Sequence, residues 1–117
     1  MLQRMDARVR RFIATGAKVV LLLEPAQAQE SVSTGAEAMD HDYEQLNNLL
    51  RTVALQFPKH VALVDLAGRV CPSGPPCHSV VRGVWVRPDN IHYGAPGSLW
   101  VAKWLVPQIV RAADSLH

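Results

Sequence analysis

The sequence predicts an α/β fold organised around a parallel sheet, and three observations support this class. The chain has 117 residues, the length of one modest domain, so we expect a single domain over residues 1–117. Segments with helical spacing of apolar residues alternate with short apolar runs rich in β-branched residues, the order that builds parallel sheets with right-handed crossovers. Hydrophobic residues make up 49% and charged residues 19%, which excludes a disordered or fibrous chain.

The N-terminal segment predicts an amphipathic surface helix. Its apolar residues recur at helical spacing, arginines occupy the other faces, and Gly16 follows where a helix C-cap is expected. The apolar positions are Leu2, Met5, Val9, Phe12 and Ile13. Because charge is spread through this segment, it lacks the pattern of a secretory signal peptide.

Residues 18–23 are a continuous apolar run that predicts a strand buried on both faces of the sheet, and Glu24 and Pro25 end it. Residues 26–40 are polar without a clear period, so we expect a long loop at the carboxyl end of this strand, where α/β proteins place functional groups. The longest strongly apolar run covers only residues 19–23, whereas a membrane-spanning helix needs about 20 apolar residues. We therefore expect no transmembrane segment.

Residues 42–57 predict a second helix, ended by Pro58, and residues 61–65 predict a second buried strand. The apolar face of this helix consists of Tyr43, Leu46, Leu49, Leu50, Val53, Ala54 and Phe57. Residues 71–77 are rich in Pro and indicate an irregular loop, and residues 80–86 predict a small strand pair or an extended segment.

A final helix is expected from about Pro96 to Leu116, with a kink at Pro107. Packing against the sheet explains its large apolar side chains more simply than ligand stacking does. The residues expected to face the core are Trp100, Trp104, Leu105, Ile109 and Val110.

The charge balance argues against a nucleic-acid partner. The chain has 12 Lys and Arg against 10 Asp and Glu, a net charge of +2 with His neutral. So small an excess does not make the broad basic surface of a nucleic-acid-binding protein. We therefore expect no nucleic acid among its partners.

Cys71 and Cys77 have five residues between them and can close a small loop. The sequence favours a disulfide, which would stabilise the fold by about 2 kcal/mol in the chain-entropy model and would imply an oxidising compartment. Two reduced, structurally idle thiols are the first alternative. The second is a metal site that adds His78, although the usual second pair of zinc ligands is missing, so we expect no bound metal.

Asp89 and His92 carry the most informative spacing in the chain. In a hydrolase that uses Ser, His and Asp, the imidazole accepts the serine proton while a carboxylate holds its other ring nitrogen. An Asp three residues before the His on a tight turn can supply that carboxylate from the same loop. The pair also occurs by chance on protein surfaces, so its sequence context decides how it is interpreted.

Residues 87–97 (RPDNIHYGAPG), followed by residues 101–109 (VAKWLVPQI), resemble the last block of the SGNH (GDSL-type) hydrolase family. The chain is most similar to the SGNH domains fused to bacterial acyltransferase-3 membrane proteins, over about residues 16–113. The resemblance implies that Asp89 and His92 are the acid and base of the catalytic triad. It also implies a flavodoxin-like three-layer α/β/α sandwich with a parallel sheet of about five strands.

Two family motifs are missing from the sequence. It has neither the Gly-Asp-Ser block of the nucleophile nor a Gly-x-Asn-Asp block, and Ser31, Ser33 and Ser73 lack the strand-to-turn context of a nucleophile. We therefore expect the chain to correspond to the C-terminal portion of an SGNH domain, without its N-terminal strands and inactive alone. Arg87 is expected to be an exposed surface arginine.

The resemblance implies an esterase or O-acyltransferase that acts on acyl esters, O-acetyl groups of sugars or cell-envelope glycans above all, without a cofactor. The expected partners are this acylated substrate and a membrane acyltransferase domain or the missing N-terminal half. The family resemblance and the pair of cysteines together imply a periplasmic or cell-surface location. The alternative is a non-catalytic binding module, or an inert remnant of such a domain. No substrate-binding residues are identified.

Overall fold

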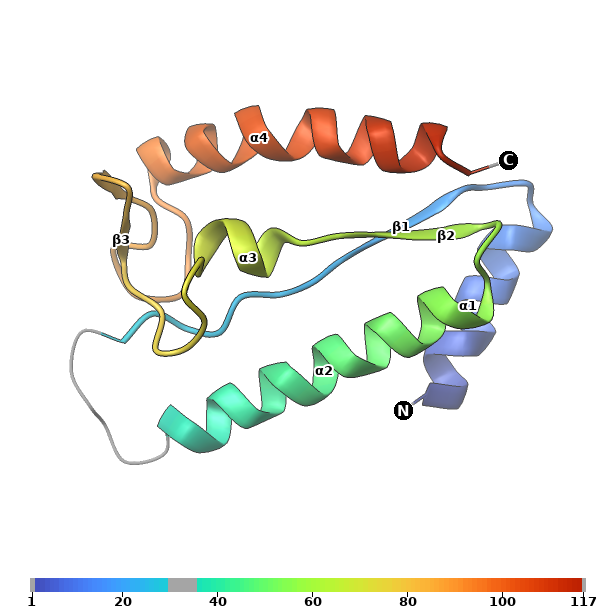
Figure 1. Cartoon of the computed structure of the whole chain (residues 1–117), viewed down its shortest axis with the longest axis horizontal. Helices are drawn as coiled ribbons and strands as arrows, with labels where there is room; N and C mark the ends of the chain where they lie inside the picture. Colours follow the sequence, from blue (N-terminus) through green and yellow to red (C-terminus); the bar gives the residue numbers. More distant parts are fainter. Residues whose placement is uncertain (1, 30–35, 117) are drawn as a thin grey trace.

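The alternating helical and β-branched segments fold, in a computed structural model, into a mixed α/β arrangement (Figure 1). The structure describes residues 2–29 and 36–116, and the side chains of all of these except residues 36–39. The elements in chain order are α1 (Leu2–Ala14), β1 (Val19–Leu22), α2 (Ala36–Gln56), β2 (Val61–Val64), α3 (Leu66–Val70), β3 (Val80–Val81), β4 (Val84–Trp85) and α4 (Ala95–Asp114).

The strands β1 and β2 pair in parallel, in a register that runs from Val19 opposite Val61 to Leu22 opposite Val64. The helix α4 lies on one side of this pair, and α2 lies on the other side (Figure 1). The predicted order of helices and parallel strands is therefore confirmed for this part of the chain. Within the described residues the parallel sheet has two strands, fewer than the about five strands of the expected sandwich.

Two apolar clusters hold the layers together. One joins α1, α2 and β2 through Val9, Val53 and Val61, all of which are buried. The other joins α3, β3 and α4, and its buried members are Leu66, Val70, Val81, Val86 and Val101. Each fully buried valine contributes about 1.5–3 kcal/mol relative to an exposed one, so these clusters supply much of the folding free energy.

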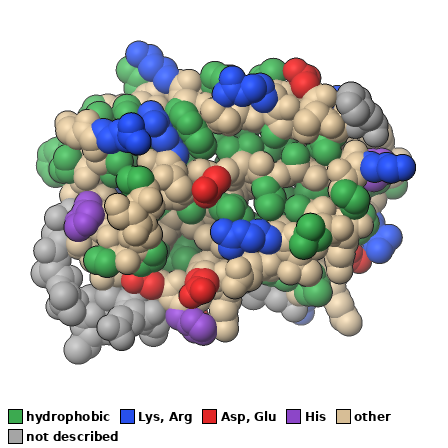
Figure 2. Space-filling model, viewed as in Figure 1, with side chains coloured by type: hydrophobic (Ala, Val, Ile, Leu, Met, Phe, Trp, Pro, Cys, Tyr) green, Lys and Arg blue, Asp and Glu red, His purple; other side chains and the backbone are tan. Residues whose placement is uncertain are grey.

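The strand β1 is less buried than predicted. All four of its residues are half-buried, whereas the sequence predicts burial on both faces. Within the described residues, β2 is the only strand that pairs with β1. Hydrophobic side chains are accordingly visible between α4 and α2 in the space-filling view (Figure 2).

Three further expectations are corrected by the structure. The helix α2 begins at Ala36, inside the segment predicted as a loop, because residues 36–39 have high helix propensity although they show no amphipathic period. Phe12 on α1 and Val110 on α4 are 59% and 53% exposed, so neither belongs to the core. Trp100, Trp104 and Leu105 do pack against the second cluster, as predicted.

The short helix α3 is absent from the sequence prediction because five residues are too few to show a period. Asp65 starts it: its carboxylate accepts a hydrogen bond from the backbone N–H of Gly68 at 2.8 Å and so caps the first turn.

A tight hairpin and a long helix complete the fold. Arg82 and Gly83, between β3 and β4, both have positive φ angles (51° and 79°), as a two-residue hairpin turn requires. The helix α4 continues unbroken past Pro107. Gly97, in its first turn, lies so close to the carbonyl oxygen of Val86 that a Cβ atom there would collide with it.

Candidate active site

The loop between β4 and α4 carries Asp89 and His92 and is closed by its own backbone. The N–H of Asn90 donates to the carbonyl of Arg87 at 2.9 Å, and the N–H of Gly94 donates to the carbonyl of Val86 at 3.1 Å. Asn90 has a φ of 70°, in the left-handed region that Asn tolerates better than most residues. The resulting turn brings the side chains of Asp89 and His92 together.

Both carboxylate oxygens of Asp89 are used. Oδ1 accepts hydrogen bonds from the backbone N–H groups of Ile91, at 2.9 Å, and His92, at 2.6 Å. Oδ2 lies 2.6 Å from Nδ1 of His92. The side-chain hydrogen bond to His92, followed by the two backbone hydrogen bonds, holds the pKa of Asp89 well below its usual range. The predicted contact between the two side chains is therefore present.

His92 is held at one ring nitrogen and free at the other. An ionised carboxylate only accepts hydrogen bonds, so the contact with Asp89 places the proton of a neutral imidazole on Nδ1. Nε2 then carries the lone pair, and it has no hydrogen-bond partner among the described residues. The His92 side chain is 80% exposed. This arrangement can accept a proton from a group that approaches from solvent.

The loop that carries Asp89 and His92, called the dyad below, is hydrogen-bonded to the segment that follows β1. The N–H of Ala28 donates to the carbonyl of Asn90 at 2.8 Å, and the N–H of Gln29 donates to the carbonyl of Cys77 at 2.7 Å. The loop therefore sits beyond the carboxyl end of β1, the edge of a parallel sheet where α/β proteins place their sites.

Cys71 and Cys77 form a disulfide, as the sequence favours. Both are buried, and with Ala26 they form a small apolar cluster against which Tyr43 packs. The bridge leaves no thiolate for the alternative metal site with His78. The described residues also contain no group of three potential metal ligands.

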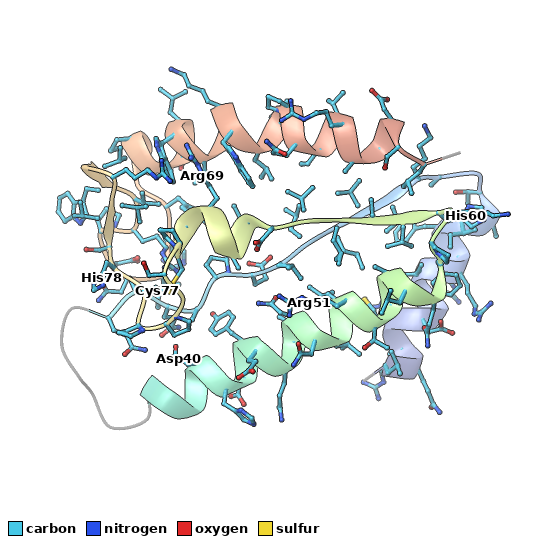
Figure 3. All side chains as sticks on the ribbon, in the orientation of Figure 1. Asp40, Arg51, His60, Arg69, Cys77 and His78 are labelled. Carbon is cyan, nitrogen blue, oxygen red and sulfur yellow. A yellow bond between two sulfur atoms is a disulfide. The ribbon has the colours of Figure 1, made fainter. Side chains whose placement is uncertain are left out.

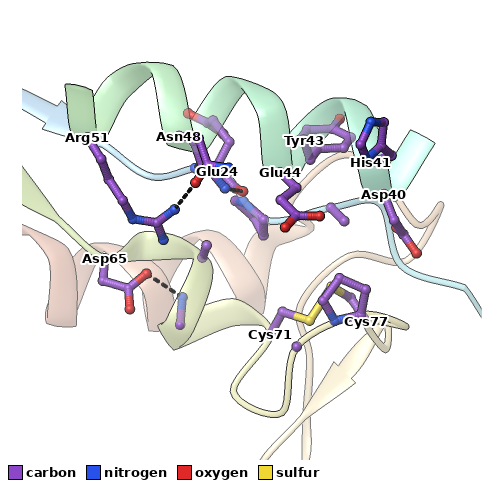
Figure 4. Close-up of a pocket in the computed structure, with 17 residues that line it drawn as sticks. Glu24, Asp40, His41, Tyr43, Glu44, Asn48, Arg51, Asp65, Cys71 and Cys77 are labelled. Carbon is purple, nitrogen blue, oxygen red and sulfur yellow. Dashed lines mark hydrogen bonds between the residues drawn. A yellow bond between two sulfur atoms is a disulfide. The ribbon is translucent and has the colours of Figure 1, made fainter. Parts of the chain in front are cut away.

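A cleft of about 740 Å³ lies between α2, the segment after β1, α3 and the disulfide loop (Figure 4). Ala26, Gly74 and both cysteines contribute to its walls. Its polar lining consists of Glu24, Asp40, His41, Glu44, Asn47, Asn48, Arg51 and Asp65. Asp89 and His92 do not line it, so this cleft and the Asp89–His92 pair are separate features joined through residues 26–29.

Asn47 has a role that the sequence reasoning missed. Its Oδ1 accepts from the backbone N–H of Glu24, and its Nδ2 donates to the backbone carbonyl of Glu24, both at 2.8 Å. The amide thus clamps the chain where it leaves β1 toward the cleft. The signal for this role was a polar residue on the apolar face of the predicted helix, one turn from Tyr43 and Leu50.

Arg87 is not the exposed surface arginine that was expected. Only 2% of it is exposed, and its Nη1 donates to the carbonyl of Ala26 at 2.6 Å. Burial lowers the pKa of Arg87, while the nearby phenols of Tyr93 and Tyr43 act in the opposite direction. Burial also raises the pKa of Tyr93.

Of the three serines weighed in the sequence, one lies within the described residues. Ser31 and Ser33 lie outside the described residues, and Ser73 is exposed in the disulfide loop.

No described helix is long and apolar enough to span a bilayer. Comparisons with protein-family models, curated proteins and solved structures give no match. The resemblance to SGNH hydrolases therefore rests on the sequence motifs alone.

Proposed function

We propose that Asp89 and His92 are the acid and base of an SGNH-type esterase or O-acyltransferase whose nucleophilic serine comes from a segment outside this sequence. The observation that carries the proposal is the 2.6 Å contact between Asp89 Oδ2 and His92 Nδ1, with Nε2 facing solvent. An Asp and a His in contact are common, but an Asp held by two backbone N–H groups is fixed in orientation. That fixation suits a base that must keep one tautomer.

In this mechanism the incoming serine gives its proton to Nε2 of His92 as its oxygen attacks the acyl carbonyl carbon. Asp89 stabilises the imidazolium that forms and does not itself take the proton. His92 then returns the proton to the leaving alcohol, and water or an acceptor hydroxyl releases the acyl group by the same steps in reverse. Backbone or amide donors beside the serine stabilise the oxyanion.

The substrate class and location follow from the family resemblance. We propose O-acetyl esters of sugars or cell-envelope glycans as substrates and a periplasmic or cell-surface location. The disulfide is compatible with such an oxidising compartment. We also propose that β1 and β2 are two strands of a larger three-layer sandwich, because helices lie on both sides of the pair and β1 is half-buried throughout.

Ester hydrolysis by the natural open reading frame that contains this sequence tests the proposal. With p-nitrophenyl acetate as substrate, His92→Ala is expected to lower kcat/KM by at least about 100-fold, the usual effect of losing a general base. His60→Ala is the matched control, because His60 lies at the opposite end of the strands from Cys77 (Figure 3). Equal activity of the wild type and His92→Ala would reject the proposal.

A non-catalytic binding module is the second candidate, and one observation favours it: the 740 Å³ cleft does not include the dyad. Its polar and charged lining suits a hydrophilic ligand. Under this reading, an Arg51→Ala variant in the cleft would lose ligand binding while His92→Ala would retain it. Arg51 and Asp65 both extend into this cleft (Figure 4).

A further inference from the structure

Arg87 begins the tight turn that carries Asp89. Its carbonyl accepts a hydrogen bond from the backbone N–H of Asn90 at 2.9 Å, so residues 87–90 form a β-turn with Asp89 in the third position. Pro88 occupies the second position, where the fixed φ of proline suits such a turn. The orientation of this turn therefore determines where the Asp89 carboxylate lies.

Both ends of the turn are hydrogen-bonded to the same short segment after β1. Nη1 of Arg87 donates to the carbonyl of Ala26 at 2.6 Å, and the N–H of Ala28 donates to the carbonyl of Asn90 at 2.8 Å. With the bond across the turn, these two contacts close a ring of three hydrogen bonds. Two of the three join backbone groups, and the third comes from the Arg87 side chain. A turn attached at one point can swing about it, whereas attachment at two points also fixes its rotation.

The Arg87 side chain is suited to this attachment by its burial and its length. Only 2% of the residue is exposed, and its backbone N–H is itself held by the carbonyl of Ser79 at 3.2 Å. A hydrogen bond from a charged donor is stronger where water is excluded. Nη1 also lies at the far end of a long planar group, beyond the reach of a lysine ammonium on the same backbone.

We propose that Arg87 is a positioning residue, whose side chain holds the turn of residues 87–90 so that the Asp89 carboxylate keeps His92 in a single tautomer. Arg87 acts through the turn and is not itself a catalytic residue. The proposal concerns the geometry of the contact between Asp89 and His92. Its consequence for catalysis rests on the proposed function.

Arg69 offers a matched control, because it is a second arginine in a packed environment. Its guanidinium carbon lies 4.1 Å from the ring centre of Trp100 and 5.7 Å from that of Trp104. These cation–π contacts connect Arg69 to α4, toward which it points in the side-chain view (Figure 3). Arg69→Lys therefore disturbs packing without removing a bond from the ring.

NMR of the His92 ring in the ¹⁵N-labelled chain tests the positioning role directly. With a neutral imidazole, we expect the wild type and Arg69→Lys to show one tautomer, with the proton on Nδ1. Arg87→Met, which removes the donor, and Arg87→Lys, which keeps the charge but not the reach, are expected to show a mixture of tautomers. The pKa of the Asp89 carboxyl, followed by ¹³C NMR, should rise toward its ordinary value in both Arg87 variants, because the hydrogen bond to His92 is its largest cause. A residue that only stabilises the fold would lower Tm without changing the tautomer.

The unaltered chain gives a second readout, which does not require any variant to fold. A guanidinium held at Nη1 is expected to show separate, slowly exchanging Nη–H signals at low temperature, whereas a freely rotating guanidinium shows averaged ones. Averaged Arg87 signals in the wild type would overturn the proposal. A single Nδ1–H tautomer in Arg87→Lys would overturn it as well.

Ester hydrolysis by the natural open reading frame that contains this sequence then connects positioning to catalysis. Arg87→Lys is expected to lower kcat by about 10- to 100-fold and to leave KM unchanged, because a misaligned base slows the chemical step. Arg69→Lys should keep the wild-type kcat. A wild type without esterase activity would reject the proposed function, while the NMR result would still decide the role of Arg87. An active wild type and an equally active Arg87→Lys would overturn the positioning role alone.

Discussion

The backbone N–H of Ala28 donates a hydrogen bond to the carbonyl of Asn90 at 2.8 Å, which attaches the loop of Asp89 and His92 to the segment after β1. On its other side, the same segment is attached to the disulfide loop, since Gln29 donates to the carbonyl of Cys77 at 2.7 Å. Asp89 and His92 are therefore exposed side chains on a loop that is anchored on both flanks. An anchored loop suits a catalytic pair, because its geometry does not have to be assembled when substrate arrives.

The Asp89 carboxyl is expected to titrate well below the value of about 3.9 that Asp has in unfolded chains. A pKa depressed by folding stabilises the folded protein above that value, and the stabilisation is lost as the pH falls toward the folded pKa. His92→Ala removes the largest cause and should raise the Asp89 pKa, as measured by carboxyl ¹³C NMR. Titration of Asp89 near 3.9 in the wild type would show that the contact does not persist in solution.

The Asn47 clamp predicts a large effect from a small truncation. Asn47→Ala leaves the backbone N–H and carbonyl of Glu24 without their partners, at a cost of about 1–3 kcal/mol for each group that stays buried. The neighbouring Asn48→Ala, at an exposed position on the same helix, should change the free energy of unfolding by less than about 0.5 kcal/mol. Urea denaturation of both variants gives the comparison, and equal stabilities would exclude the clamp.

Gly97→Ala tests the close approach between α4 and Val86, the residue that follows β4. Alanine favours helix by about 1 kcal/mol, but its Cβ would meet the carbonyl oxygen and Cα of Val86, which are backbone atoms and cannot rotate away. We expect a net loss of about 1–3 kcal/mol and a lower Tm. Ser98→Ala, the next and exposed position, is the control. A higher Tm for Gly97→Ala would mean that the helix start has room.

The disulfide is tested by counting reactive thiols and by measuring the free energy of unfolding. Unfolding the unreduced protein should expose no reactive thiol, and unfolding after reduction should expose 2 thiols. The Cys71→Ser, Cys77→Ser double variant should lose about 2 kcal/mol, because the unfolded chain regains the entropy of the closed loop. Thiols that react in denaturant without reductant would contradict the bridge.

Features encoded by neighbouring residues could be predicted from the sequence. The β-branched runs predicted β1 and β2, and the amphipathic period predicted α1 and most of α2. The three-residue spacing predicted the contact between Asp89 and His92. Each depends on a local pattern of residues, which is what a sequence displays.

Features that depend on distant residues could not be predicted. Arg87 is buried because Ala26, 61 positions away, offers its carbonyl, and Asn47 is a clamp because Glu24, 23 positions away, passes beside it. The half-burial of β1 likewise depends on how many strands flank it, which its own residues do not reveal. The spacing of Asp89 and His92 also says nothing about where the cleft beside α2 lies.

The most direct test of the proposed function is whether His92 activates a serine. A fluorophosphonate probe forms a covalent bond with a serine whose proton is taken by a neighbouring base, so it measures that step without requiring the natural acyl group. For the natural open reading frame that contains this sequence, the proposal predicts labelling of one serine that falls by at least about 100-fold in His92→Ala and is retained in His60→Ala. Labelling that is absent from the wild type, or equal in wild type and His92→Ala, would contradict it.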